Sequence, residues 1–137
     1  KLKVVRGQEL LVGGWPDPQG ARSGLGALLL GYYDGDDLRY AGKVGTGFDE
    51  KTLARLASLL APLSRSTNPF TDSADEIRRT SRTSAAQTHW VEPRVVVQIG
   101  FSEWTGAGRL RHPRYQGLRD DKNPREVVRE EPHPIGP

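Results

Sequence analysis

The sequence contains no cysteine, which excludes disulfide bridges, thiolate nucleophiles and thiolate metal ligands. Its three histidines, His89, His112 and His133, are scattered along the chain without the spacing that metal ligands require, so we expect no metal site. No stretch approaches the apolar length of a membrane-spanning helix, and the start at Lys1 does not have the form of a signal peptide. We therefore expect no membrane association.

The 137 residues that are present suit one domain, since a second core would be too small to be stable. The hydrophobic fraction is 35% and the mean hydropathy is −0.61, which predicts a modest core with long exposed loops. The chain has no initiator methionine and starts on charged residues, so we expect an excised fragment of a larger protein.

Three β-strands are expected in the first third of the chain. The stretch QELLVGGW (8–15) places an apolar run before a turn, and GALLLGYY (26–33) is continuously apolar, as a central strand would be. Asp34-Gly35-Asp36 then predicts a hairpin, since Asp-Gly supplies the positive φ angles of tight turns. The third strand is LRYAGKV (38–44), and together the three make a meander.

The period of the apolar residues then changes from that of strands to that of a helix. Asp49 is a candidate N-cap, and Pro62 lies near the helix end. The apolar positions at helical spacing are Leu53, Leu56, Leu59, Leu60 and Leu63. The Ser/Thr/Arg-rich stretch 64–88 follows, and we expect it to form a long mobile loop.

The strongest β signal of the chain lies in its last third. Residues 90–91 and then RVVVQIGFSEW (94–104) are expected as strands, the second with the alternation of a half-buried strand. A last strand is expected at 108–111, and a short C-terminal helix at Pro124 with Asn123 as its cap.

This order predicts an all-β fold with one inserted helix, arranged as an OB-fold, a five-stranded Greek-key barrel. An SH3-like barrel has the same number of strands. The helix between the third and fourth strands favours the OB-fold.

Positive charge gathers near the C-terminus, where residues 109–125 hold six basic and two acidic side chains, and this indicates a polyanionic partner. In RDDK (119–122), Arg119 offers a planar fork and Lys122 a point charge, the usual pair on a phosphate chain. Asp120 is placed to hold Arg119. Pro113 and Gly117 predict a shaped loop before the motif.

Two other features bear on phosphate binding. The glycine clusters at 24–26, 45–47 and 106–108 do not fit a nucleotide-binding loop, and we interpret them as turns and barrel bends. Lys1 and Lys3 would lie about 7 Å apart on one face of an extended segment, a spacing that suits two phosphate oxygens. The alternative is a frayed terminus with solvated lysines, which is favoured when the two lysines are considered by themselves.

Four stretches together resemble one known family. They are KLKVVRGQELLVGGW, GLGALLLGYYDGDDLRYAGKVGTGF, HWVEPRVVVQIGFSEWT and GRLRHPRYQGLRDDKNPREVV. In this order and at this spacing they are similar to the C-terminal OB-fold domain of ATP-dependent DNA ligases, above all the bacterial ligases of non-homologous end joining. The resemblance covers nearly the whole chain and breaks at about 65–87.

The resemblance implies a division of the chain. Residues 1–7 would end a nucleotidyltransferase domain with its K-x-K motif, residues 8–130 would form the OB-fold domain with a flexible loop at about 65–87, and residues 131–137 would be a tail or linker. The preceding domain would carry the adenylated lysine and hold most of the ATP and Mg²⁺. We expect the isolated chain to be inactive.

The resemblance also implies roles for individual residues. Lys1, Lys3 and Arg111 would contact ATP phosphates, the last together with Pro113 in an R-x-P motif. Arg119, Asp120 and Lys122 match the terminal R-x-D-K motif, so Arg119 and Lys122 would orient the β- and γ-phosphates during enzyme adenylation. In a second pose the domain would clamp nicked double-stranded DNA, and the candidate DNA contacts are Arg22, Lys43, Arg78, Arg79 and Arg82.

The family context implies further partners, namely Ku and polymerase or nuclease modules, and a cytoplasmic, nucleoid-associated setting. Two alternatives remain open: a stand-alone OB-fold module that binds nucleic acid without catalysis, and a domain that recruits repair partners. Single-strand binders need exposed aromatic side chains. Here Trp15, Tyr32, Trp90, Phe101 and Trp104 lie in apolar strand context, which favours a place in the core.

Overall fold

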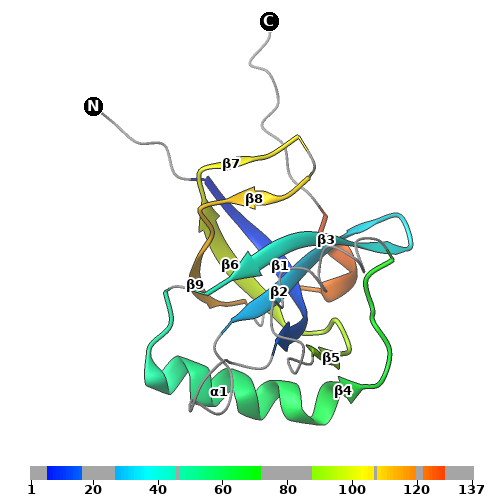
Figure 1. The fold of residues 1–137 in the computed structure, drawn as a ribbon, viewed down its shortest axis with the longest axis vertical. Helices are drawn as coiled ribbons and strands as arrows, with labels where there is room; N and C mark the ends of the chain where they lie inside the picture. The colour runs from blue at the N-terminus through cyan, green and yellow to red at the C-terminus, as the bar shows by residue number, and fades with distance from the viewer. Residues whose placement is uncertain are drawn as a thin grey trace, which may run out of the picture.

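The computed structural model describes residues 6–16, 27–45, 47–71, 88–106, 108–119 and 122–128. Its centre is β1 (Arg6–Pro16), which pairs antiparallel with β2 (Leu28–Asp34) on one side. On its other side, β1 pairs with β5 (Thr88–Val91) and β6 (Val96–Phe101). Figure 1 shows β1 running through the middle of the curved main sheet.

The remaining strands extend this sheet or form a small second one. The strand β3 (Asp37–Val44) pairs with β2, β4 (Ser64–Arg65) pairs with β5, and β9 (Arg114–Leu118) pairs with β6. The second sheet is a hairpin of β7 (Glu103–Trp104) and β8 (Leu110–Arg111). Within the described residues no pairing joins β3 to β9, so the predicted barrel is curved but not closed.

One α-helix, α1 (Glu50–Leu60), is inserted after β3 as predicted, and it continues into the 3₁₀ turn η1 (Ala61–Leu63). Asp49 is the N-cap, and its Oδ1 accepts a hydrogen bond of 2.7 Å from the Thr52 amide. Leu56 and Leu60 are fully buried in the main core, whereas Leu59 is 40% exposed. In Figure 1 the helix lies at the opposite end of the sheet from the β7–β8 hairpin.

Strand alternation divides the apolar residues between two hydrophobic clusters. Leu10 and Val12 of β1 belong to the main cluster, whereas Leu11 between them belongs to the second. On β6, Val97 and Ile99 likewise face the main cluster. The second cluster includes Val96, Phe70 and Val127, so segments outside the principal strands cover this face of the sheet. Trp15, Tyr32, Trp90 and Trp104 pack against these clusters, and Phe101 is buried in the first.

The predicted mobile loop is wrong for its first part, residues 64–71. Ser64 and Arg65 form β4, and Thr71 donates a backbone hydrogen bond of 2.9 Å to Leu38. Phe70 is 6% exposed and meets Tyr40 edge to face at 5.3 Å. Strand pairing, a backbone hydrogen bond and one buried aromatic therefore fix a segment whose composition is that of a loop. Residues 72–87 lie outside the described residues.

Other predicted boundaries also differ from the structure. The expected strand 94–104 is interrupted at Ser102, and the expected strand 108–111 is reduced to β8. The stretch containing Gly117, expected as a loop, is the strand β9. The hairpin between β2 and β3 is as predicted, with Gly35 at φ 66°.

The C-terminal segment 122–128 packs back onto the sheet. Asn123 caps the 3₁₀ turn η2 (Pro124–Glu126), where the short helix was expected. Val127 is 1% exposed and accepts a 2.7 Å hydrogen bond from the Tyr33 amide, and Val128 bridges to the same strand. No helix in the described part of the chain has the length and apolar character needed to cross a membrane.

Candidate functional site

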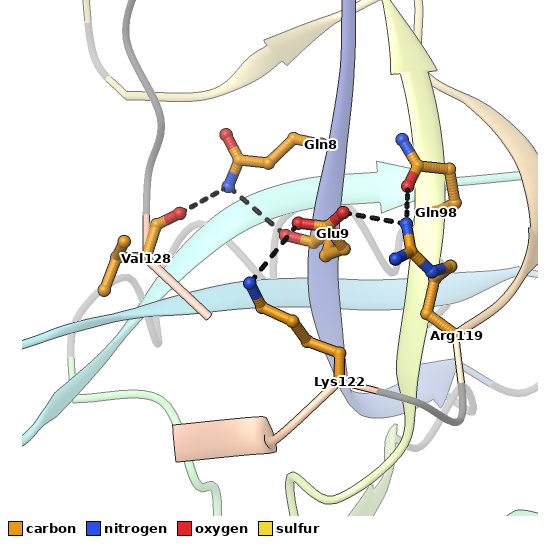
Figure 2. A network of polar contacts seen from close by, with 6 residues as sticks. All are labelled: Gln8, Glu9, Gln98, Arg119, Lys122 and Val128. Carbon is orange, nitrogen blue, oxygen red and sulfur yellow. Dashed lines mark hydrogen bonds and ion pairs between the residues drawn. The ribbon is translucent and has the colours of Figure 1, made fainter. Parts of the chain in front are cut away.

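Arg119 lies at the end of β9, where its backbone and its side chain are both held by neighbouring strands. Its amide donates a 2.8 Å hydrogen bond to the Val96 carbonyl, which extends the pairing of β9 with β6 by one step. Its Nη1 donates to Glu9 Oε2 and to Gln98 Oε1, both at 2.9 Å (Figure 2). The guanidinium is therefore oriented by β1 and β6 together.

Lys122 approaches the same carboxylate from the other side. Its Nζ lies 3.9 Å from Glu9 Oε1, so each oxygen of Glu9 faces one cation (Figure 2). The Glu9 side chain is 17% exposed, against 36% for Arg119 and 29% for Lys122. A carboxylate so withdrawn from water depends on paired cations, because an unpaired charge there would be costly.

The register of β1 against β6 brings the two acceptors of Arg119 together. Glu9 and Gln98 are direct Cα partners in this pair. Gly7 leaves the space that the Gln98 side chain occupies, because a Cβ on Gly7 would lie 2.7 Å from Gln98 Nε2. A glycine two residues before Glu9 thus allows the amide to turn toward Arg119.

Gln8 ties the segment that carries Lys122 to β1. The residue is 1% exposed, and its Nε2 donates to the Val128 carbonyl at 2.9 Å and to the Glu9 carbonyl at 3.3 Å. A buried amide needs such partners, since an unsatisfied polar group would destabilise the fold. The Gln8 bond to Val128, together with burial of Val127, fixes the chain shortly after Lys122.

This arrangement can bind an anionic group with several oxygens. Arg119, Lys122 and Glu9 leave one positive charge in excess, and the guanidinium and ammonium groups converge on two oxygens of one anion. Phosphate presents oxygens of the same kind, and Arg and Lys are its usual ligands. The donor set therefore fits the polyphosphate of ATP, with Arg119 and Lys122 as the residues that would hold it.

The structure does not bring Arg111 to this cluster. Arg111 lies on β8, and its Nε pairs with Glu103 at 2.9 Å. Its carbonyl accepts from the Ser102 amide, whereas Arg119 bonds to Val96 at the other end of β6. Ser102 and Val96 are six residues apart along an extended strand, a distance of about 20 Å. Arg111 instead lies at the end of the sheet where β1 begins, since Arg6 pairs with Phe101.

The other predicted contacts are mostly beyond what the structure describes. Lys43 is exposed on β3, opposite Leu29. The predicted residues that lie outside the described residues are Lys1, Lys3, Arg22, Arg78, Arg79, Arg82 and Asp120. In RDDK the third position of an R-x-D-K motif is Asp121, which corrects the match to Asp120, and Asp121 lies outside them too.

Three residues of the site, Glu9, Gln8 and Gln98, were not predicted from the sequence. Each is a polar residue in a stretch with the apolar pattern of a strand, QELLV or VVVQI. Such a polar residue was the one feature of the sequence that could have indicated a role in the site. A polar side chain in a buried strand indicates a specific partner, because burial without one is unfavourable.

Comparison with known proteins identifies the family. Residues 21–122 match the model of the ATP dependent DNA ligase C terminal region. The chain is 44% identical over 124 residues to the multifunctional non-homologous end joining protein LigD of Mycobacterium bovis, covering 90% of this chain but 16% of that protein. It is 37% identical over 135 residues to LigD of Pseudomonas aeruginosa, covering 96% of this chain and 15% of that protein.

Solved structures agree with the sequence comparisons and with the predicted OB-fold class. The ligase domain of Mycobacterium tuberculosis LigD superimposes with a TM-score of 0.79 at 40% identity, over 92% of this chain and 39% of that one. A mycobacterial DNA ligase D complexed with ATP and MES gives a TM-score of 0.73 at 41% identity, over 91% and 38%. The chain therefore belongs to the family of C-terminal regions of ATP-dependent DNA ligases, and it is similar to that part of the bacterial end-joining protein LigD.

Proposed function

We propose that this domain orients the β- and γ-phosphates of ATP while a ligase that contains it becomes adenylated, through Arg119 and Lys122. A lysine of the nucleotidyltransferase domain would attack the α-phosphorus, and the bond to the bridging oxygen would break so that pyrophosphate leaves. The two cations would align that leaving group and stabilise its charge. Such positioning is most of what phosphoryl-type transfer requires of a protein.

The observation that carries this proposal is the convergence of Arg119 and Lys122 on one carboxylate (Figure 2). Two cations held side by side by separate strands and segments form a prepared anion site. The similarity to a DNA ligase D complexed with ATP supports ATP as the source of that anion. Mg²⁺ would accompany the ATP and be held mainly by the nucleotidyltransferase domain. Alone, the 137-residue chain is expected to form no AMP adduct.

The test separates the first step of ligation from the last in a ligase that contains this domain. Arg119→Ala and Lys122→Ala should each lower the rate of self-adenylation with labelled ATP, by about a hundredfold for Arg119. Both variants should seal a pre-adenylated nick within about threefold of the parent rate, because that step involves no polyphosphate.

Two further variants serve as controls for this test. Arg114→Ala removes an exposed arginine of β9 and should leave both steps unchanged. Since Arg119→Ala leaves Glu9 short of a partner, Arg119→Lys is included, which keeps the charge and loses the planar fork. Equal loss of adenylation and sealing in the Arg119 variants would contradict the proposal.

We further propose that a second pose of the domain clamps nicked duplex DNA. The candidate contacts are exposed Lys43 together with Arg22, Arg78, Arg79 and Arg82. They would bind the sugar–phosphate backbone, as sealing of breaks of any sequence requires. In an end-joining ligase the partners would include Ku and polymerase or nuclease modules.

A further inference from the structure

The negative charge of Glu9 makes its position in the proposed phosphate site unexpected. A carboxylate repels phosphate, yet this one lies between the two residues assigned to bind phosphate. It is also the least exposed of the three side chains, at 17%. Arg119 has a second, neutral acceptor in Gln98, so one acceptor would remain to it without a carboxylate.

We propose that Glu9 is a positioning residue that takes the place of a phosphate group. While ATP is absent, each of its oxygens holds one cation, which keeps Arg119 and Lys122 side by side. When ATP binds, the polyphosphate draws Lys122 away from Glu9 and also binds Arg119, which keeps its contacts with Glu9 and Gln98. This inference rests on the proposed function of Arg119 and Lys122.

Two opposite effects of Glu9 follow from its geometry. The carboxylate fixes two long side chains in advance, so less rotamer entropy is lost when ATP binds. Its charge also offsets one of the two cations, which weakens their attraction for the polyphosphate. Removing the charge and removing the side chain therefore have different consequences.

The contact of Lys122 with Glu9 is suited to such an exchange. At 3.9 Å it is an ion pair without the short distance of a strong charge-assisted hydrogen bond, and Lys122 is 29% exposed. Arg119, by contrast, makes two contacts of 2.9 Å to different strands. The lysine is thus the more easily transferred of the two cations.

The experiment compares Glu9→Gln and Glu9→Ala in a ligase that contains this domain, by steady-state and single-turnover adenylation. Glu9→Gln keeps an oxygen for Arg119 and removes the charge, so KM for ATP should fall roughly three- to tenfold with kcat little changed. Glu9→Ala removes the holder of both cations, so kcat/KM should fall roughly tenfold. Sealing of a pre-adenylated nick should be unchanged in both.

The matched control is Glu92→Gln. Glu92 pairs with Arg65 at 3.4 Å, so this variant removes one carboxylate of another Glu–Arg pair outside the site. Its KM for ATP should equal that of the parent. Circular dichroism and the thermal midpoint report whether each variant folds.

The two proposals fail in different ways. A KM for ATP in Glu9→Gln that is unchanged or raised overturns the phosphate-substitute role, while a selective adenylation defect in the Arg119 variants would leave the proposed function intact. Loss of folding in Glu9→Gln would also overturn it, since the carboxylate would then serve the fold. If the Arg119 variants lose both steps equally, the proposed function itself is wrong.

Discussion

The smallest structural unit of the site is a single carboxylate shared between two cations. Arg119 contributes a planar guanidinium whose Nη1 donates to both Glu9 and Gln98 on neighbouring strands. Lys122 contributes a point charge at the other oxygen. The two are not interchangeable, because a lysine at position 119 could not bond two acceptors with the same fixed geometry.

A glycine outside the site packs closely against β9, the strand that precedes Arg119. Gly47 has φ 96°, and a Cβ there would collide with the Tyr115 carbonyl oxygen and lie 2.9 Å from the Tyr115 nitrogen. Tyr115 belongs to β9, the strand that ends before Arg119. Gly47→Ala should therefore destabilise the domain by about 1 to 3 kcal/mol, measured by urea unfolding.

The control for this substitution is Gly106→Ala. A Cβ added at Gly106 would have no atom within 4 Å, and the φ of Gly106 is not in the left-handed region. Its midpoint of urea unfolding should stay close to that of the parent. If the two variants unfold alike, the close approach of Gly47 to Tyr115 is not what limits that position.

The sequence predicted the cations of the site but not what holds them. Arg119 and Lys122 fall within one four-residue stretch, where their chemistry is visible locally. The contact of Arg119 with Glu9 joins residues 110 positions apart and depends on the β1–β6 register. Register is a tertiary property, so the partner could not be named from the strand pattern alone.

Among the structural elements, the ones with strong periodicity were predicted well. The helix α1 begins after Asp49, and β1, β2 and β3 lie within two residues of their expected limits. The strand β9 was missed because RYQGL has one buried residue, Tyr115, and a glycine. Residues 64–71 were missed because the contacts that hold them, the pairing of β4 with β5 and the burial of Phe70, are tertiary.

The N-cap of α1 gives a prediction with a defined pH dependence. Hydrogen bonds from Thr52 hold the pKa of the Asp49 carboxyl below its ordinary value of 3.8. A lowered pKa in the folded state means that this stabilisation is present above pH 3.8 and is lost as the pH falls through the folded value. Asp49→Ala should therefore lower the thermal midpoint at pH 7, and the difference from the parent should shrink at acidic pH.

Asp49→Asn is the matched variant, since asparagine caps helices about as well as aspartate without a titrating charge. Its thermal midpoint at pH 7 should lie close to that of the parent. The part of the acid-dependent loss of stability that is assigned to Asp49 should be absent. A constant difference between Asp49→Ala and the parent at all pH values would contradict the role of the ionised carboxyl.

For the molecule as a whole, the proposed contact with DNA should depend on the excess of positive charge. The net charge is +3, and binding to the backbone should release counterions and weaken as salt rises. In a ligase that contains this domain, replacing Arg78, Arg79 and Arg82 with alanine should reduce the slope of log affinity against log salt by up to about 3. Adenylation should be unaffected, because the proposed phosphate contacts are Arg119 and Lys122 instead.

The measurement is a titration of nicked duplex, intact duplex and single strand at two salt concentrations. Lys51→Ala, on the exposed part of α1, is the control and should leave the slope for nicked duplex unchanged. A marked preference for single strands would instead favour a stand-alone OB-fold module. The buried or packed positions of Phe101, Trp15 and Trp104 argue against such a stacking surface.

The pairing of Glu9 with Arg119 also bears on how the chain matures during synthesis. Glu9 leaves the ribosome 110 residues before Arg119 does, which at ordinary translation speeds is roughly 5 to 20 s. The bond from Gln8 to Val128 forms later still, because the acceptor lies 120 residues downstream. The residues of β1 to β6 are thus synthesised before the anion site can form, and a chain cut short before Arg119 would have the Glu9 carboxylate without either of its cations.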